Sequence, residues 1–230
     1  MAQAAPVLTL HMHPLSSYCW KALIALYETG TPFQNRVIEG RPAEDAAMRA
    51  LWPVAKMPVL EDASRGQVVP ETSIIIEYLQ RHYPGPARLI PDDPDRQIET
   101  RLWDRVFDLH VQGPMQKLVS DRMRPDGSKD PAGAAEALAA LEVVYDVLET
   151  RMAATAARDD FTLADCAAAP ALFYAQAVRP FSPDQAELRG YFERLLARPS
   201  VHRAIKEAQP YLHWFPFHEA LDRRFFSADF

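Results

Sequence analysis

The sequence predicts a small α/β domain followed by an all-α domain. Strand-like and helix-like segments alternate up to residue 84, and prolines then cluster between residues 84 and 94. After the prolines, apolar residues recur only at helical spacing. We therefore expect a first domain over residues 1–84, a linker over residues 85–93 and an all-helical domain over residues 94–230.

The first domain should contain short strands with helices packed on them. A helix is predicted after Ser16 and Ser17, whose hydroxyls are suitable N-caps, and Gly30 ends it. A polar, Ala-rich segment covers residues 42–50, and a further helix is predicted over residues 71–83. The order βαβ followed by ββα indicates a small sheet covered by helices. The predicted strands cover residues 7–12, 33–38, 57–60 and 67–69.

The second domain should be a helical bundle around one apolar helix. Residues 163–178 are apolar nearly all round, which predicts a central helix. Thr162 and Asp165 fit a capping box at its start, so we interpret Asp165 as a stability residue and not as a catalytic acid. Shorter helices are predicted over residues 188–196 and 201–208. Two apolar stripes at helical spacing precede the central helix: Ile98, Leu102, Val106, Leu109, Gly113 and Leu138, Leu141, Tyr145, Leu148, Met152.

Composition and charge narrow the classes of partner. The chain is 48% hydrophobic and 24% charged, which is typical of a folded globular protein. Its formal net charge of -6 argues against binding to nucleic-acid phosphates or to an anionic membrane surface. The N-terminus lacks the pattern of a secretory signal, and two cysteines are too few for a disulfide framework. We therefore expect a cytoplasmic protein with no nucleic-acid or membrane partner.

Phosphate-binding and metal-binding motifs are absent from the sequence. The glycines fit neither GxGxxG nor the P-loop spacing, and HExxH and paired CxxC are also missing. His11 and His13 alternate along a predicted strand and share a face. Two histidines without a third ligand more often pack or form hydrogen bonds than bind a metal. We therefore expect no metal ion.

The first candidate site is the start of the first helix. Ser16 and Ser17 lie where a strand ends and the helix begins. A helix N-terminus carries partial positive charge and unpaired N–H groups. A serine there can donate a hydrogen bond to an anion such as a thiolate. The alternative is that either serine is only an N-cap.

The second and third candidate sites lie at residues 56–60 and at the start of the helix over 71–83. If the Met57–Pro58 bond is cis, the backbone of Met57 can turn outward and pair with an extended ligand. The alternative is an ordinary edge-strand proline.

At the third site, Thr72 and the helix N-terminus offer donors to a carboxylate, and Glu71 can accept from an ammonium group. This combination suits the α-amino acid end of a peptide, although an ordinary capped helix explains it as well.

These segments, in this order, resemble a cytosolic glutathione transferase over nearly the whole chain. The resemblance rests on Ser-x-x-Cys at the first helix, Lys-Met-Pro-Val-Leu, Glu-Thr-Ser-Ile-Ile-Ile-Glu-Tyr-Leu and Thr-Leu-Ala-Asp. It implies a thioredoxin-like N-terminal domain and an all-α helical-bundle C-terminal domain. The Ser-Ser-Tyr-Cys-Trp tract looks like that of the serine-type theta, delta and zeta classes, which implies a bacterial serine-type enzyme.

The resemblance also implies roles for these residues. Ser16, or Ser17 beside it, would stabilise the thiolate of glutathione, which then attacks a small hydrophobic electrophile. Met57 would hold the cysteinyl backbone before a cis Pro58. The γ-glutamyl end and the glycyl carboxylate would be held by Glu71, Thr72 and Lys56. The implied activity is that of a detoxifying transferase, with glutathione as its co-substrate.

The electrophile site is expected between the domains, and the protein is expected to be a homodimer. A fourth-helix face with Arg101, Asp104 and Asp108 is a candidate dimer surface. The aromatic tail over residues 211–230 either caps the pocket or covers the first domain. The candidate electrophile residues are Trp103, Phe107, His110, Met115 and Tyr174.

Four other functions stay open at the level of sequence. The protein could be a glutathione-dependent isomerase of the maleylacetoacetate type, or a dehalogenase. Cys19 offers a different chemistry, in which a mixed disulfide makes the protein a reductase. A non-catalytic binding or assembly module with the same fold is the alternative from another class.

Overall fold

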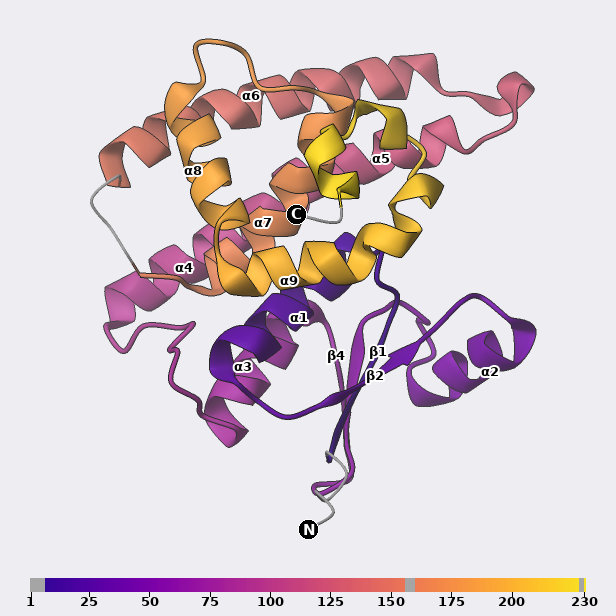
Figure 1. Ribbon diagram of the computed structural model, residues 1–230, viewed down its shortest axis with the longest axis vertical. Coiled ribbons are helices and arrows are strands. Elements are labelled where there is room, and N and C mark those ends of the chain that lie inside the picture. Colours follow the sequence, from indigo (N-terminus) through magenta and orange to yellow (C-terminus); the bar gives the residue numbers. More distant parts are fainter. Residues whose placement is uncertain (1–6, 156–159, 228–229) are drawn as a thin grey trace.

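Figure 1 shows the computed structural model of the chain, which describes residues 7–155, 160–227 and 230. Within these residues, the N-terminal part is a four-stranded mixed sheet, ordered β2-β1-β3-β4, with helices packed on it. β1 and β2 are parallel, and the pairs β1–β3 and β3–β4 are antiparallel. The elements are β1 (Leu8–Met12), α1 (Ser17–Thr29), β2 (Gln34–Val37), α2 (Pro42–Leu51), β3 (Val59–Asp62), β4 (Gln67–Pro70) and α3 (Thr72–His82).

Local sequence accounts for most of these boundaries. The side chain of Ser16 caps α1, and Gly30 ends it in the left-handed conformation, with φ 63°. The polar segment before β3 forms the helix α2, which begins with Pro42 in its first turn. Glu44 folds back to accept a hydrogen bond from the backbone N–H of Arg41 at 3.2 Å. Met48 is the only residue of α2 that is buried, so most of this helix faces solvent.

The C-terminal part is all helical, which confirms the predicted fold class. Its central helix is α7, whose residues are almost all buried. Asp165 accepts hydrogen bonds from the backbone N–H and the hydroxyl of Thr162, both at 2.8 Å, at the start of α7. None of the helices in the described part of the chain combines the length and apolarity needed to cross a membrane. The elements are α4 (Pro94–Val106), the π-helical η1 (Phe107–Gln112), α5 (Gly113–Arg122), η2 (Asp126–Ser128), α6 (Pro131–Thr155), α7 (Leu163–Val178), α8 (Ala186–Leu196), α9 (Pro199–Ala208), η3 (Gln209–Trp214), η4 (His218–Ala220) and η5 (Arg223–Phe226).

The apolar stripe of α4 and η1 faces away from the core. Ile98, Leu102 and Leu109 are 68%, 54% and 57% exposed. The buried residues of α4 are instead polar, namely Thr100 and Asp104. An apolar stripe normally marks the buried side of a helix, so this reversal identifies an apolar outer surface.

α1 joins the two parts of the molecule. It lies between the sheet and the helices α7 and α9 (Figure 1). Glu28, near the end of α1, accepts hydrogen bonds from the guanidinium of Arg198 at 2.9 and 2.7 Å. The hydroxyl of Tyr27 donates to Glu207 of α9 at 2.6 Å.

A buried ionic cluster lies at the same interface. The ammonium of Lys21, which is 1% exposed, lies 2.5 Å from Asp104 and 2.7 Å from Asp108, and it donates to the hydroxyl of Ser73 at 2.9 Å. Ser73 in turn donates to Asp104 at 2.7 Å. Burial raises the pKa of Asp108, and the adjacent Lys21 opposes that rise. We call these four residues the Lys21 cluster.

The Lys21 cluster corrects the expected dimer surface. Asp104 and Asp108 are 1% and 6% exposed, so they face the first domain and not a second copy of the chain. Of the three residues expected on that surface, only Arg101 lies outside the cluster, and it pairs with Glu77 of α3 at 2.8 Å.

Asp62 should be a stability residue with a pH-dependent contribution. Its buried carboxylate accepts from Tyr78 at 2.7 Å, from Tyr83 at 2.5 Å, and from Ser64 and Arg65. Burial alone raises its pKa, but these hydrogen bonds lower the pKa from 3.8 to about 2. The carboxylate therefore stabilises the fold fully above about pH 4, and this stabilisation is lost as the pH falls toward 2.

We expect Asp62→Asn to lower the free energy of unfolding at pH 7 by about 1–3 kcal/mol, because the amide cannot accept all these hydrogen bonds. The difference from the unmutated protein should shrink between about pH 4 and pH 2. Urea unfolding across this range measures both effects, with Asp126→Asn as the exposed control. Equal stability at pH 7 would contradict the assignment.

Lys21→Met should destabilise the protein strongly, because it removes the buried counter-ion of two buried carboxylates and leaves only the half-exposed guanidinium of Arg105, 3.9 Å from Asp104 and 3.4 Å from Asp108. We expect a loss of about 3–5 kcal/mol in the free energy of unfolding, measured by denaturant titration. Adding Asp104→Leu and Asp108→Leu to the same chain should recover part of this loss. Lys117→Met, at an exposed lysine of α5, is the matched control. A loss no larger than that of the control would show that the buried ion pairs contribute little.

Candidate glutathione site

Ser16 lies at the junction between β1 and α1, as predicted. Its backbone is extended, with φ -79° and ψ 119°, which is the usual N-cap conformation. Its hydroxyl oxygen accepts a hydrogen bond from the backbone N–H of Cys19 at 3.4 Å. A hydroxyl that accepts in this way still has its own proton to donate. The N-cap role and the role of donor to an anion are therefore compatible in the same side chain.

Ser17 has a different environment from Ser16. It is 3% exposed and accepts a hydrogen bond from the side-chain amide of Gln112 in η1. Ser16, by contrast, is only partly buried. Of the two predicted catalytic serines, Ser16 is therefore the more exposed.

The geometry does not favour a thiol chemistry based on Cys19. Its side chain is completely buried in the first domain. Burial raises the pKa of its thiol to about 11, although the hydrogen bond with Ser16 acts in the opposite direction. A buried, protonated thiol is a poor nucleophile, so the reductase alternative lacks structural support.

The two histidines of the first strand have protein partners. His11 is buried, and its Nε2 atom lies 3.0 Å from Glu61 on β3. The Nδ1 atom of His13 accepts a hydrogen bond from the backbone N–H of Leu15 at 3.1 Å. Burial lowers the pKa of His13. Among the residues described, no group of three or more His, Cys, Asp or Glu side chains is placed to hold a metal ion.

The second predicted site has the required backbone geometry. The Met57–Pro58 peptide bond is cis. β3 begins at Val59, which pairs with His11 of β1, so Met57 lies just beyond the strand. The side chain of Met57 packs among the apolar residues of the first domain. Its main chain thus precedes a sheet strand at the position where an extended peptide can pair with it.

The third predicted site combines a helix N-terminus with an unusual backbone conformation. Glu71 is exposed and has φ 66°, a left-handed value that is uncommon outside glycine. It directly precedes α3, whose first residue Thr72 is 7% exposed. Residues in such conformations cluster at ligand-binding positions. The next residue, Ser73, belongs to the Lys21 cluster, so the start of α3 is tied to the helical domain. Lys56 is exposed to solvent.

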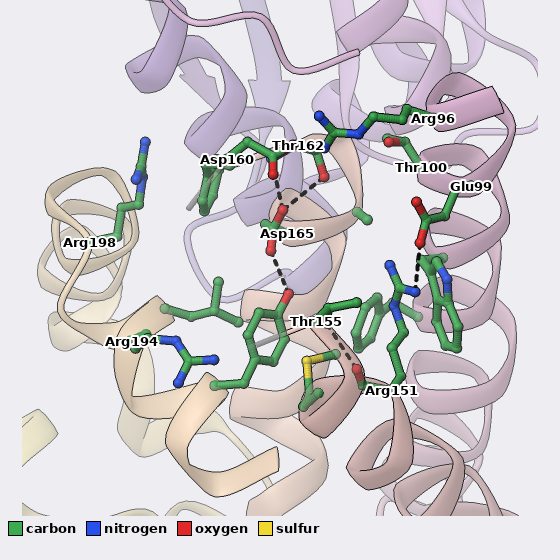
Figure 2. Close-up of a pocket in the computed structure, with 17 residues that line it drawn as sticks. Arg96, Glu99, Thr100, Arg151, Thr155, Asp160, Thr162, Asp165, Arg194 and Arg198 are labelled. Atoms are coloured by element: carbon green, nitrogen blue, oxygen red, sulfur yellow. Dashed lines mark hydrogen bonds and ion pairs between the residues drawn. The ribbon is translucent and has the colours of Figure 1, made fainter. Parts of the chain in front are cut away.

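The structure separates most of the expected electrophile residues, and only Trp103 and Phe107 line the same cleft (Figure 2). Phe107, Met115 and Tyr174 are buried in the core of the helical domain. The hydroxyl of Tyr174 donates to the carbonyl of Leu15 at 2.8 Å, so it supports the loop that precedes Ser16. Trp103 lines a cleft within the helical domain. His110 is exposed and lines an outer groove.

Other aromatic residues lie closer to Ser16. The ring of His13, three positions before Ser16, contacts Tyr211 edge-on at 5.2 Å and stacks on Trp214 at 6.3 Å. Trp214 remains 58% exposed. The aromatic tail therefore returns to the first domain beside the start of α1. The density of aromatic residues indicated that the tail has a role, but nothing in the sequence indicated that His13 is its partner.

Comparisons with known proteins agree with this geometry. A family model described as "Glutathione S-transferase, N-terminal domain" matches residues 10–87, and one described as "Glutathione S-transferase, C-terminal domain" matches residues 108–199. A "Glutathione S-transferase-like protein LUC7" from Fusarium is 33% identical over 147 residues, which are 63% of this chain and 64% of that protein. The match thus spans a little less than two thirds of the Fusarium protein.

Two other proteins are similar to this chain over a larger share of its length. A "Stringent starvation protein A homolog" from Coxiella burnetii is 27% identical, over 88% of this chain and 93% of that protein. A crystal structure of a glutathione S-transferase from Methylobacillus flagellatus, with glutathione bound, has a TM-score of 0.75 at 23% identity and covers 86% of this chain and 98% of its own. Both halves of the chain thus match the two domains of one family, in the order found there, and the chain belongs to the glutathione S-transferase superfamily.

Proposed function

We propose that this protein is a glutathione transferase that stabilises the thiolate of glutathione through Ser16 and conjugates it to a small hydrophobic electrophile. The observation that carries this proposal is the position of Ser16, which is partly exposed at the N-cap of α1 with a hydroxyl proton available to a ligand. The glutathione bound in the related Methylobacillus structure supports the choice of co-substrate.

The proposed chemistry depends on the ionisation of the thiol. A free thiol has a pKa of about 8.5, so little thiolate is present at neutral pH. A hydrogen bond from Ser16 and the partial positive charge of the α1 N-terminus favour the anion. A shift of about two units corresponds to roughly 2.7 kcal/mol in favour of the thiolate. The thiol proton leaves to solvent, and the sulfur lone pair forms a carbon–sulfur bond while the electrophile loses a leaving group or takes up a proton.

Three segments of the first domain are proposed to hold glutathione. The backbone of Met57, before cis Pro58, pairs with the cysteinyl residue in the manner of an added strand. The hydroxyl of Thr72 and the N-terminus of α3 bind the γ-glutamyl carboxylate, and Glu71 accepts from its ammonium group. Lys56 binds the glycyl carboxylate from its exposed position.

We place the electrophile beside His13, Tyr211 and Trp214. These rings lie next to the loop that carries Ser16, and Trp214 offers an exposed aromatic face. This placement replaces the earlier expectation of Trp103, Phe107, His110 and Tyr174, which lie in the core or on other surfaces. The isomerase and dehalogenase activities remain predictions, as do the cytoplasmic location and the role in detoxification.

A second candidate function is that of a non-catalytic binding module. The similarity to the Coxiella protein favours it, because that relative is named for stringent starvation and not for a transferase. The two functions differ in turnover. Glutathione binding without conversion of aryl halides, epoxides or cis-enones would support the binding module.

Replacing Ser16 by alanine tests the proposed chemistry. We expect Ser16→Ala to raise the pKa of bound glutathione by at most about two units, because the N-terminus of α1 remains, and to lower kcat at pH 7 by at most about 25-fold. Ultraviolet absorbance of the thiolate across a pH series measures the first effect, and turnover of an aryl halide measures the second. Ser120→Ala, at an exposed serine of α5, is the control. An unchanged pH profile in Ser16→Ala would move the role to another group.

We further propose that the protein is a homodimer that buries the outer apolar surface of the helical domain. A groove of about 470 Å³ on this surface is lined by apolar side chains, including Val106, Val143 and Val147. Ile98 and Leu102 extend the surface along α4, because residues spaced by four share one helix face with Val106. Exposed apolar patches of this kind are typical of protein–protein interfaces.

Charged substitutions on this surface should give a monomer. We expect Leu102→Glu and Val143→Glu each to separate the copies, because the introduced carboxylate cannot be solvated in an apolar interface. Size-exclusion chromatography with light scattering measures the mass, and Met123→Glu, at an exposed position at the end of α5, is the control. A monomeric unmutated protein, or dimers in both variants, would contradict the proposal.

A further inference from the structure

Three successive carbonyl groups anchor the loop that precedes α1. The carbonyl of His13 accepts a hydrogen bond from the backbone N–H of Ser16 at 3.0 Å, which closes a tight turn. The next two carbonyls accept from the buried side chains of Trp20 and Tyr174, the latter at 2.8 Å. A loop that is held at every carbonyl has little conformational freedom, so the backbone of His13 is preorganised beside Ser16.

The same loop fixes the position of the proton on the His13 ring. The Nδ1 atom accepts a hydrogen bond from the backbone N–H of Leu15 at 3.1 Å. Because a backbone N–H can only donate, Nδ1 carries no proton, and the neutral ring is protonated at Nε2. Burial lowers the pKa of His13, and the negative charge of Glu39 opposes this shift only in part. The ring is therefore neutral at pH 7 and presents an N–H group at Nε2.

The Nε2 atom of His13 is available to a ligand. None of the hydrogen bonds formed within residues 7–155, 160–227 and 230 involves this atom. In this part of the chain it is also not among the few buried side-chain atoms that lack a hydrogen bond, so it is open to solvent. Because Nε2 is already protonated, it can donate to a ligand but cannot take up the thiol proton of glutathione.

Two aromatic side chains of the tail lie against the ring that carries this donor. The ring of His13 meets Tyr211 edge-on and stacks on Trp214, and Tyr211 and Trp214 lie edge to face with their centroids 5.4 Å apart. Trp214 is nevertheless 58% exposed. The three rings form a small aromatic surface with one N–H donor on it. A flat apolar group that carries an acceptor oxygen matches both features.

We propose that His13 selects electrophiles in which the carbon attacked by the thiolate is conjugated to a carbonyl group, and that its Nε2–H group donates to the carbonyl oxygen. This inference rests on the proposed transferase function and names its substrate class as aryl-substituted enones. The aryl group lies against Trp214, and the oxygen points to Nε2.

The proposed step is an addition in which His13 keeps its proton. The sulfur forms a bond to the β-carbon of the enone, the π electrons of the carbon–carbon double bond shift, and negative charge collects on the oxygen. The Nε2–H group stabilises this charge through a hydrogen bond, as a neutral imidazole can. The α-carbon then takes up a proton from water, which balances the thiol proton released to solvent.

Two substrates with the same phenyl group test the proposal on the full chain. Benzylideneacetone is an enone, whereas benzyl chloride has no oxygen and loses chloride. His13→Phe keeps an aromatic ring against the tail and removes Nε2–H. We expect it to lower kcat/KM for benzylideneacetone at least about tenfold and that for benzyl chloride by less than about threefold. His82→Phe, at a partly buried histidine in contact with Tyr78 at the end of α3, is the matched control and should leave both rates unchanged.

Nitrogen NMR of the histidine rings in the unmutated protein provides a second arm that needs no substitution for its main result. At pH 7 the ring of His13 should be protonated at Nε2 alone, and an excess of benzylacetone, the unreactive saturated ketone, should shift the Nε2 signal in the presence of glutathione. The signals that disappear in His13→Phe assign this ring.

The outcomes separate this inference from the transferase function. A proton on Nδ1, an Nε2 signal that benzylacetone does not move, an equal loss of both rates in His13→Phe, or conversion of benzyl chloride alone would overturn the role of His13 and leave the transferase function intact. Conversion of neither substrate by the unmutated protein would contradict the transferase function and, with it, this inference.

Discussion

The interaction on which the arrangement of this protein depends is the buried ion pairing of Lys21 with Asp104 and Asp108. A single ammonium group, with almost no solvent contact, connects α1, the start of α3 and the junction of α4 with η1. Buried charges are costly to desolvate, so the pairing is favourable only when all its members are in place. The cluster therefore holds the two parts of the molecule in one relative position, and with them the helix N-termini that form the candidate site.

The candidate site depends on backbone geometry more than on charged side chains. Ser16 caps α1, cis Pro58 precedes β3, and Glu71 adopts a left-handed conformation before α3. Each feature places N–H groups or a carbonyl at the edge of the first domain where a peptide can reach them. Because Ser73 belongs to the Lys21 cluster, the strained turn at Glu71 is supported from the helical domain. Local strain of this kind persists only where the surrounding structure enforces it.

The helical domain has two surfaces of different chemistry. The outer face of α4 and α6 is apolar and exposed, as a partner surface would be. The cleft between α4, α6, α7 and α8 is lined instead by arginines and aromatic rings. The difference follows from the placement of polar residues on α4, where Thr100 and Asp104 turn inward and Ile98 and Leu102 turn outward.

Features that depend on near neighbours in the chain could be read from the amino-acid sequence. The N-caps at Ser16 and Thr162, the end of α1 at Gly30 and the central position of the apolar α7 could all be predicted, because capping and amphipathicity are local properties. Tertiary structure alone decided which face of α4 is buried, since that choice depends on Lys21 more than eighty residues earlier. It also decided that Tyr174 supports the loop before Ser16 and that the tail reaches His13. Contacts between residues so distant in sequence leave no periodic signal, because they arise only when the two domains pack together.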